Sequence, residues 1–291
     1  MYNPKNTCYL CGSNEHILIH KGVRGDQNTN VLKCSKCGLV RLDNFITNED
    51  DTFYEESGMW QSNGMESEII KARIDAKADD DRRAEFVRNY IINKRVLDFG
   101  CGSGGFIHGV KSFATYVAGV ELERDKREYL ISEGIDCFPS VDEIPDEKYD
   151  VITLFHVLEH LPEPIEILDK LEKHLSQGGK MIIEVPNADD ALLSKYKSDS
   201  FADFTYWVCH LFLYTNKTLT ELIEKCHMRV SFIQQIQRYP LSNHLYWLSH
   251  NKPGGHKEWA AFNDPEMDSL YGKHLSRLGI ADTIMAVVGK E

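Results

Sequence analysis

Four of the eight cysteines in this 291-residue chain form two closely spaced pairs near the N-terminus. Cys8 and Cys11 are followed by a glycine, and so are Cys34 and Cys37. Two C-x-x-C-G knuckles can direct four thiolates at one tetrahedral ion, because each glycine lets the backbone turn toward the sulfurs. The spacing therefore predicts a zinc site made of Cys8, Cys11, Cys34 and Cys37. Four protein ligands leave no open position on the ion, so we expect a structural role.

A second chemical pattern is the stretch HVLEH at residues 156–160, which matches the H-x-x-E-H zinc motif of one class of metallopeptidase. Such a motif needs a secure helix that carries both histidines on one face. Here an apolar, β-branched strand at 149–155 runs directly into His156, and two prolines follow the motif at once. We therefore expect one loose turn with no third ligand nearby, which disfavours a peptidase. Glu159 and His160 are interpreted as residues that orient the loop.

The stretch RVLDFGCGSGGF, residues 95–106, leads from a short apolar strand into a glycine-rich loop. Gly100 and Gly102 let the backbone approach a ligand with no Cβ in the way. A second strand ends at Glu121, where a carboxylate suits the hydroxyls of a ribose. The glycine spacing also fits a dinucleotide. However, Asp98 would repel a pyrophosphate and suits the ammonium of a methionyl group, so the residues favour a cationic ligand.

Four motifs in this order resemble those of class I S-adenosylmethionine-dependent methyltransferases: VLDFGCGSGGF, VAGVE, YDVITLFHVLEHLPEP and GGKMIIEVPN. The match covers about residues 85–190. It implies an α/β fold with a seven-stranded, doubly wound, Rossmann-like sheet whose last strand is antiparallel. It also implies that S-adenosylmethionine is bound by Asp98, Gly100, Gly102, Glu121, Phe155 and His156.

These motifs need elements that position them, and the hydrophobic patterns predict where those elements lie. We expect a zinc ribbon at 1–43, a linker packed on the core at 44–65, and a methyltransferase domain at 66–291. In that domain, strands are expected at 95–99, 116–121, 149–155, 180–185, 230–237 and 282–289, and helices at 66–94, 164–175 and 216–226. The charged run at 79–83 is interpreted as a solvated face or a break.

Two aromatic segments, 190–215 and 238–281, are expected to form a lid over the acceptor, because aromatic faces with amide and imidazole groups suit flat, hydroxylated molecules. For any single aromatic residue, packing on the sheet is the simpler explanation. Removing a proton from a hydroxyl acceptor suits a histidine. His210 is the first candidate base, with His244 and His156 in reserve. The stretch HLFLYT resembles the EHLSYF-like stretch of bacterial sugar methyltransferases, although Cys209 replaces the acid.

The N-terminal cysteine pairs ahead of such a domain also resemble enzymes that methylate nucleotide-sugars for surface polysaccharides. We therefore expect methyl transfer to a sugar or nucleotide-sugar, with oxygen favoured over carbon. Two alternatives stay open: an rRNA or tRNA methyltransferase with a zinc module, and a non-catalytic cofactor-binding partner subunit. The net charge of −12 disfavours a nucleic acid partner. With no secretory signal and no long apolar run, we expect a cytoplasmic protein; the sequence does not indicate how many subunits it has.

Overall fold

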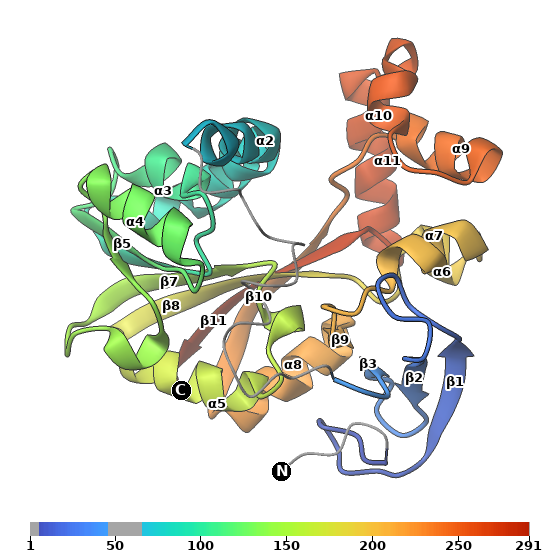
Figure 1. Ribbon diagram of the computed structural model, residues 1–291, viewed down its shortest axis with the longest axis horizontal. Coiled ribbons are helices and arrows are strands. Elements are labelled where there is room, and N and C mark those ends of the chain that lie inside the picture. The colour runs from blue at the N-terminus through green and yellow to red at the C-terminus, as the bar shows by residue number, and fades with distance from the viewer. Residues whose placement is uncertain (1–5, 46–65, 291) are drawn as a thin grey trace.

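The computed structural model describes residues 6–45 and 66–290, and its central feature is a seven-stranded sheet (Figure 1). The strand order is β10-β11-β8-β7-β4-β5-β6. Its members are β4 (Arg95–Phe99), β5 (Tyr116–Val120), β6 (Asp136–Phe138), β7 (Tyr149–Phe155), β8 (Leu175–Pro186), β10 (Met228–Ile236) and β11 (Thr283–Lys290). Strands β4 to β8 pair in parallel, whereas β11 is antiparallel to both of its neighbours. The predicted α/β sheet with an antiparallel last strand is confirmed.

Helices cover both faces of this sheet, which explains why its central strands are almost wholly apolar. On one face lie α2 (Glu66–Ile91), α3 (Gly105–Val110) and α4 (Arg124–Ser132); on the other lie α5 (Pro164–Lys173) and α8 (Asn216–Lys225) (Figure 1). Thr215 caps the N-terminus of helix α8, and its side chain accepts a hydrogen bond from the backbone N–H of Thr218 in a capping box. Every residue of β7 except Asp150 is buried.

A second, four-stranded sheet contains the N-terminal strands and one strand from much later in the chain. Its order is β1-β2-β3-β9, with β1 (His16–His20), β2 (Val31–Cys34), β3 (Val40–Leu42) and β9 (Phe212–Leu213). The backbone of β3 pairs antiparallel with β9, with Val40 opposite Leu213 and Arg41 opposite Phe212. We call residues 6–45 the four-cysteine module. The module is therefore joined to the methyltransferase domain by a shared sheet, which the sequence pattern did not predict.

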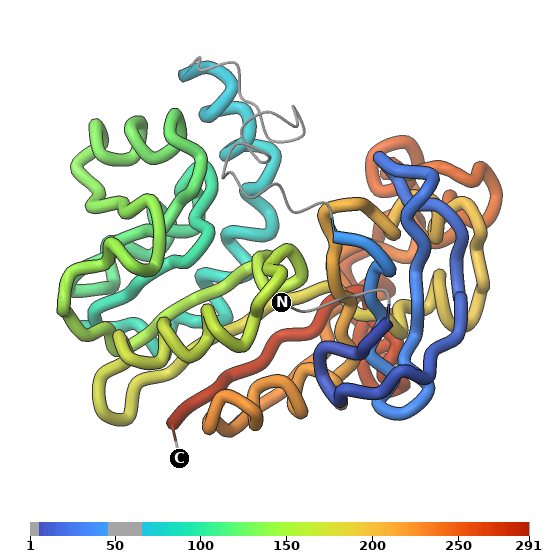
Figure 2. Tube along the Cα trace, turned by 60° about the horizontal axis from the view of Figure 1, so that its bottom comes forward, coloured from blue at the N-terminus to red at the C-terminus, as the bar shows by residue number. Residues whose placement is uncertain are grey.

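The two aromatic segments form short helices. The first contains α6 (Ala191–Ser194) and α7 (Asp199–Thr205), and the second contains α9 (Leu241–His250), α10 (Gly255–Glu258) and α11 (Pro265–Leu278). We call residues 241–278 the helical lobe. Both views place this lobe beyond one end of the large sheet, on the side of the N-terminal sheet (Figures 1 and 2). The segments pack on each other, since Trp247 contacts Phe201 and Phe204 with ring centroids 5.2 and 5.3 Å apart.

Most of the predicted linker, at 46–65, lies outside the described residues. Among the helices that the structure does describe, none is both long and apolar enough to span a bilayer.

Candidate functional site

The glycine loop after β4 is built from backbone that only glycine adopts easily. Gly100, Gly102 and Gly104 all have positive φ angles, of 76°, 53° and 75°. A Cβ atom on Gly100 would lie 2.4 Å from Val157 Cγ2, so the turn after β7 packs directly against this loop. A Cβ atom on Gly102 would meet no atom of the described residues within 4 Å. The loop is therefore closed on the protein side at Gly100 and open at Gly102, where a ligand can approach.

Glu121 lies beside this loop because β4 and β5 are adjacent parallel strands that end at the same edge of the sheet. Its Oε2 atom accepts a hydrogen bond of 2.7 Å from the backbone N–H of Gly102, and its Oε1 atom accepts one of 2.8 Å from Glu123. Burial raises the pKa of Glu121. The predicted pair of glycine loop and strand-end carboxylate is therefore brought together, with the carboxylate held in place by two amides.

Asp98 and Phe155, also predicted to contact the cofactor, lie deeper in the protein. Asp98 is only 3% exposed, and its carboxylate accepts a hydrogen bond of 2.7 Å from Thr153 Oγ1. Burial raises the pKa of Asp98 to about 7. The ring of Phe155 packs edge-on against Phe106 of α3, with centroids 4.9 Å apart. The side chain of Asp98 thus contacts Thr153 of β7, and the contacts of Asp98 and Phe155 with the cofactor stay predictions.

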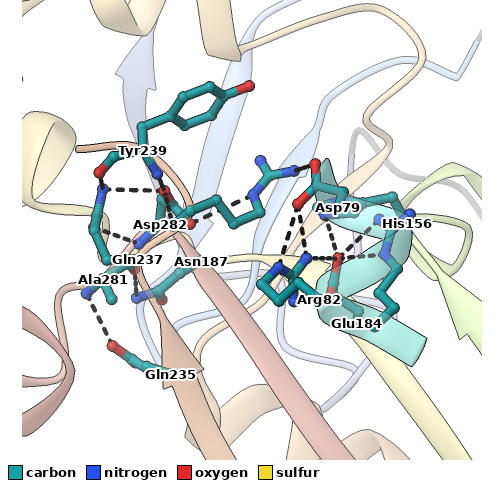
Figure 3. A network of polar contacts seen from close by, with 12 residues as sticks. Asp79, Arg82, His156, Glu184, Asn187, Gln235, Gln237, Tyr239, Ala281 and Asp282 are labelled. Carbon is teal, nitrogen blue, oxygen red and sulfur yellow. Dashed lines mark hydrogen bonds and ion pairs between the residues drawn. The ribbon is translucent and has the colours of Figure 1, made fainter. Parts of the chain in front are cut away.

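His156 is the centre of a buried charge network at the ends of β7 and β8 (Figure 3). It has a positive φ of 56°, and its ring lies between two carboxylates. Its Nδ1 atom is 3.1 Å from Glu159 Oε1, and its Nε2 atom is 3.0 Å from Glu184 Oε1. These two fully buried acids raise the pKa of His156 against the opposing effect of its burial. Because both ring nitrogens face carboxylates, His156 is suited to stabilising the fold as a protonated imidazolium. It is less suited to accepting a proton from a substrate.

The charged run at 79–83 completes this network, so its interpretation as a solvated face or a break is wrong. Both arginines of the run, Arg82 and Arg83, contact Glu184 at 2.8 Å. Burial of the acid would raise its pKa, but the histidine and arginine charges hold the pKa of Glu184 well below its usual range. A glutamate inside a buried strand needs cationic partners, and α2 supplies them.

The same network reaches the helical lobe. Arg238 lies 3.3 Å from Asp79 and 3.5 Å from Asp282, which joins α2 to the start of the last strand. His244, one of the candidate bases, is buried in α9 with Nδ1 2.7 Å from the hydroxyl of Tyr271. Burial lowers the pKa of His244 to about 4. His244 Nε2 lies 3.2 Å from Gln237 Nε2, and Gln237 donates a hydrogen bond of 3.1 Å to Asp282, so these contacts join the lobe to the network.

His210 lies next to the HVLEH turn, which the sequence did not reveal. Its ring centroid is 5.0 Å from that of His160 and 5.3 Å from that of Trp207. Burial and the neighbouring His160 lower the pKa of His210 to about 3. The turn itself, Leu158–His160, is a short 3₁₀ helix, as expected of a loose turn. The expectation that no third ligand-type side chain lies nearby is wrong, because Glu159, His160 and His210 place one such atom each within 4.8 Å of one another.

The four predicted zinc ligands converge in the four-cysteine module. The ligand sulfurs all lie within 4.8 Å of one another, with the Cys8–Cys37 and Cys11–Cys34 pairs at 3.5 Å. A disulfide would need about 2.05 Å, whereas four sulfurs at about 2.3 Å from one ion lie about 3.8 Å apart. Gly12 and Gly38 donate backbone hydrogen bonds to the carbonyls of Cys8 and Cys34. The geometry of these residues therefore fits a tetrahedral zinc ion.

The strand order, the glycine loop and the strand-end carboxylate define a class I S-adenosylmethionine-dependent methyltransferase domain. The family model for a methyltransferase domain matches residues 69–227, more than half of the chain. The protein belongs to this family.

Curated relatives and solved structures agree with this assignment. The ubiquinone biosynthesis O-methyltransferase of Candida albicans is 28% identical over 138 residues, which is 42% of this chain and 42% of that protein. Its counterpart from Nitrosococcus oceani is 30% identical over 117 residues, 36% of this chain and 50% of that protein. The chain thus spans about half the length of the curated relatives it matches.

Among solved structures, a SAM-dependent methyltransferase from Archaeoglobus fulgidus matches with a TM-score of 0.50 and 20% identity, over 72% of this chain and 92% of that one. Coclaurine N-methyltransferase matches with a TM-score of 0.51 and 16% identity, over 85% of this chain and 84% of that one. At these identities the likeness shows the fold alone.

Proposed function

We propose that the protein transfers the methyl group of S-adenosylmethionine to an oxygen atom of a small hydroxylated acceptor, a sugar or nucleotide-sugar. The observation that carries the cofactor assignment is the cradle formed by Gly102 and Glu121. One side of that glycine is open, and the carboxylate is fixed by two backbone amides. In the bound state the ribose hydroxyls would compete for the same carboxylate, and the loop backbone would approach the methionyl part.

Oxygen as the accepting atom is supported by the relatives, whose names describe O-methyltransferases. A small acceptor is supported by the surroundings of His210, where Trp207 and His160 provide an aromatic and polar wall. His160 of this wall belongs to the turn after β7, and that turn packs on the glycine loop through Val157. The sugar class comes from the sequence resemblance. The net charge of −12 weighs against the RNA alternative.

Among the three candidate bases, the contacts favour His210. His156 faces a carboxylate at each ring nitrogen, and His244 lies within the helical lobe. The Nδ1 atom of His210 lies 3.2 Å from the carbonyl of Thr205, which leaves Nε2 as the acceptor atom of the ring. Through that atom His210 would contact the acceptor. His210→Gln should therefore lower turnover while leaving S-adenosylhomocysteine affinity unchanged. The four cysteines would hold a structural zinc ion that takes no part in the transfer.

The cofactor assignment is tested by calorimetry with S-adenosylhomocysteine and, separately, NAD⁺. Glu121→Gln should weaken S-adenosylhomocysteine binding about tenfold or more, because hydrogen bonds to a charged group contribute about 1.5–3 kcal/mol. Asp125→Asn is the matched control, since this exposed carboxylate lies on the following helix and its loss should leave affinity unchanged. Equal affinity of Glu121→Gln and the wild-type protein, or tighter binding of NAD⁺, would overturn the assignment.

The acceptor is tested by transfer of a labelled methyl group to nucleotide-sugars, free sugars, hydroxylated aromatic acids and bulk RNA. Labelling of the sugar hydroxyls supports the proposal. Labelling of the aromatic acids alone would assign a different small acceptor, and labelling of RNA alone would favour the nucleic acid alternative. Binding of the cofactor with no labelling of any acceptor would favour a non-catalytic partner subunit.

A further inference from the structure

Helix α11 of the helical lobe has a stripe of apolar side chains on its exposed side. Met267, Leu270 and Leu278 are 51%, 62% and 56% exposed. With the exposed His274 they are spaced by three, four and four residues, which places all four on one side of a helix. The stripe is separate from the side that packs on the protein, which contains the buried Leu275. Scattered apolar residues on a surface are ordinary, but a continuous stripe indicates a contact surface.

Charged residues of both signs border this stripe along one edge. Glu266, Lys273 and Arg277 are all exposed, and they follow one another at spacings of seven and four residues, so they form one row along the helix. The row is acidic at the start of the helix and basic at its end. Glu266 and Arg277 lie about 16 Å apart along the helix axis, so their charges cannot pair within one chain.

The apolar stripe is complementary to a second copy of itself. Two α11 helices can pack antiparallel about a two-fold axis at the middle of the helix. In that arrangement Met267 of one copy faces Leu278 of the other, and Leu270 faces His274 of the other. Each large apolar side chain of the stripe then gains a contact that it does not have in the single chain, in the manner of the seam between two coiled helices.

The charges fit the same arrangement and favour a second copy over a membrane surface. The antiparallel register places Glu266 of each copy beside Arg277 of the other, and it sets the two helix dipoles in opposition. With a net charge of −12, two copies repel each other over most of their surfaces. The row beside the stripe contains one acid and two bases, so this face does not add to that repulsion. An anionic bilayer would attract the bases but would repel the chain as a whole.

We propose that the protein forms a two-fold symmetric dimer in which the exposed stripes of two α11 helices pack antiparallel against each other. A helix of 14 residues is about 21 Å long, so the seam is short, and small interfaces are weak and reversible. We therefore expect a dissociation constant on the order of 10 µM. The dimer goes beyond the proposed function and does not depend on it, because no contact with cofactor or acceptor enters the argument.

The test is sedimentation velocity of the full-length protein between about 1 and 200 µM, without cofactor or acceptor. The wild-type protein should change from monomer to dimer over this range. Leu270→Glu should weaken the dimer at least about tenfold, because it puts two like charges into the apolar seam. Ile131→Glu is the matched control: Ile131 is 52% exposed on α4, outside the stripe, and its variant should dimerise like the wild-type protein.

Exchange of the two charges tests the antiparallel orientation. Glu266→Lys and Arg277→Glu should each weaken the dimer about fivefold, because each change replaces two attractive pairs per dimer by repulsive ones. A variant with both changes restores opposite charges and should dimerise about as well as the wild-type protein. Since the two residues are too far apart to pair within one helix, this recovery can come only from contacts between copies.

A wild-type protein that stays monomeric throughout the range, or a Leu270→Glu variant that dimerises like the wild-type protein, would overturn the proposal. So would a monomer that binds vesicles of phosphatidylcholine and phosphatidylserine through Leu270, because the stripe would then serve a membrane surface. If the double charge exchange fails to restore the dimer, the antiparallel arrangement is wrong. Cooperative thermal unfolding shows that each variant is folded, and the charge exchanges decide the outcome if Leu270→Glu is not.

Discussion

Replacing Glu184 by glutamine tests whether the buried charge network stabilises the fold. Glu184 is fully buried, and in the described part of the chain it is the only acid that contacts Arg82, Arg83 and His156 together. The substitution removes that shared negative charge. Removing one partner of a buried ion pair costs about 3–5 kcal/mol. Asp79 still contacts Arg82 at 2.8 Å, so we expect a loss near the lower limit, about 3 kcal/mol, or a fall in Tm of about 5 °C.

The measurement is urea denaturation of both proteins at pH 7, with Asp81→Asn as the control. Asp81 pairs with Lys77 on the surface of α2, where the two side chains are 63% and 68% exposed. Its loss should cost less than about 0.5 kcal/mol. A Glu184→Gln variant as stable as this control would refute the reasoning, because the network would then not require the buried negative charge.

A pH series adds an independent check on the same residue. The pKa of Glu184 is lowered in the folded state, so its contribution is fully present above its unfolded pKa of about 4.3. That contribution is lost as the pH falls toward the lower folded pKa. The difference in stability between the wild-type protein and Glu184→Gln should therefore be constant near neutral pH and shrink in acid. A difference that grew with acidification would contradict the sign of the shift.

Two further predictions concern the glycine loop and the zinc site. Gly100→Ala should lose about 2–4 kcal/mol, from a positive φ and a Cβ clash with Val157. Gly134 has a similar φ, but among the described residues nothing lies within 4 Å of an added Cβ atom, so Gly134→Ala should lose only about 1–2 kcal/mol. Equal losses in urea denaturation would disprove the close approach at Gly100. Cys34→Ser should reduce bound zinc by about one ion per chain. It should also speed amide hydrogen exchange at Leu213, which pairs with β3. If exchange at Leu213 is the same as in the wild-type protein, the stability of β9 does not depend on the metal.

The sequence predicted those parts of the fold that local patterns specify. The apolar run at 149–155 became β7 with the same bounds, and the helix expected at 164–175 became α5 at Pro164–Lys173. Short strands such as β9, with two residues, carry too little periodicity to be recognised. The aromatic segments gave no helical expectation, because their rings serve packing between segments and so do not repeat at one local spacing.

The candidate site shows the same division between local and distant information. Gly102 and Glu121 could be paired in advance, because adjacent parallel strands bring their ends together. The approach of His210 to His160 depends on the path of the chain after β8, which no spacing encodes. Glu184 is a single acid in the apolar strand IIEVP. A buried acid needs a cationic partner, so its position in the sequence could have predicted the charge network. The arginines of the run at 79–83 are that partner.

The pairing of β3 with β9 has a consequence for biosynthesis. When Val40 and Arg41 leave the ribosome, the strand they pair with has not been made, and most of the chain must be translated before Phe212 and Leu213 emerge. At roughly 5–20 residues per second this interval is about 10–30 s. During that time β3 has an open edge that other chains could join. The N-terminal fragment alone should therefore be prone to aggregation even with its metal bound, and completion of the later segment should protect it.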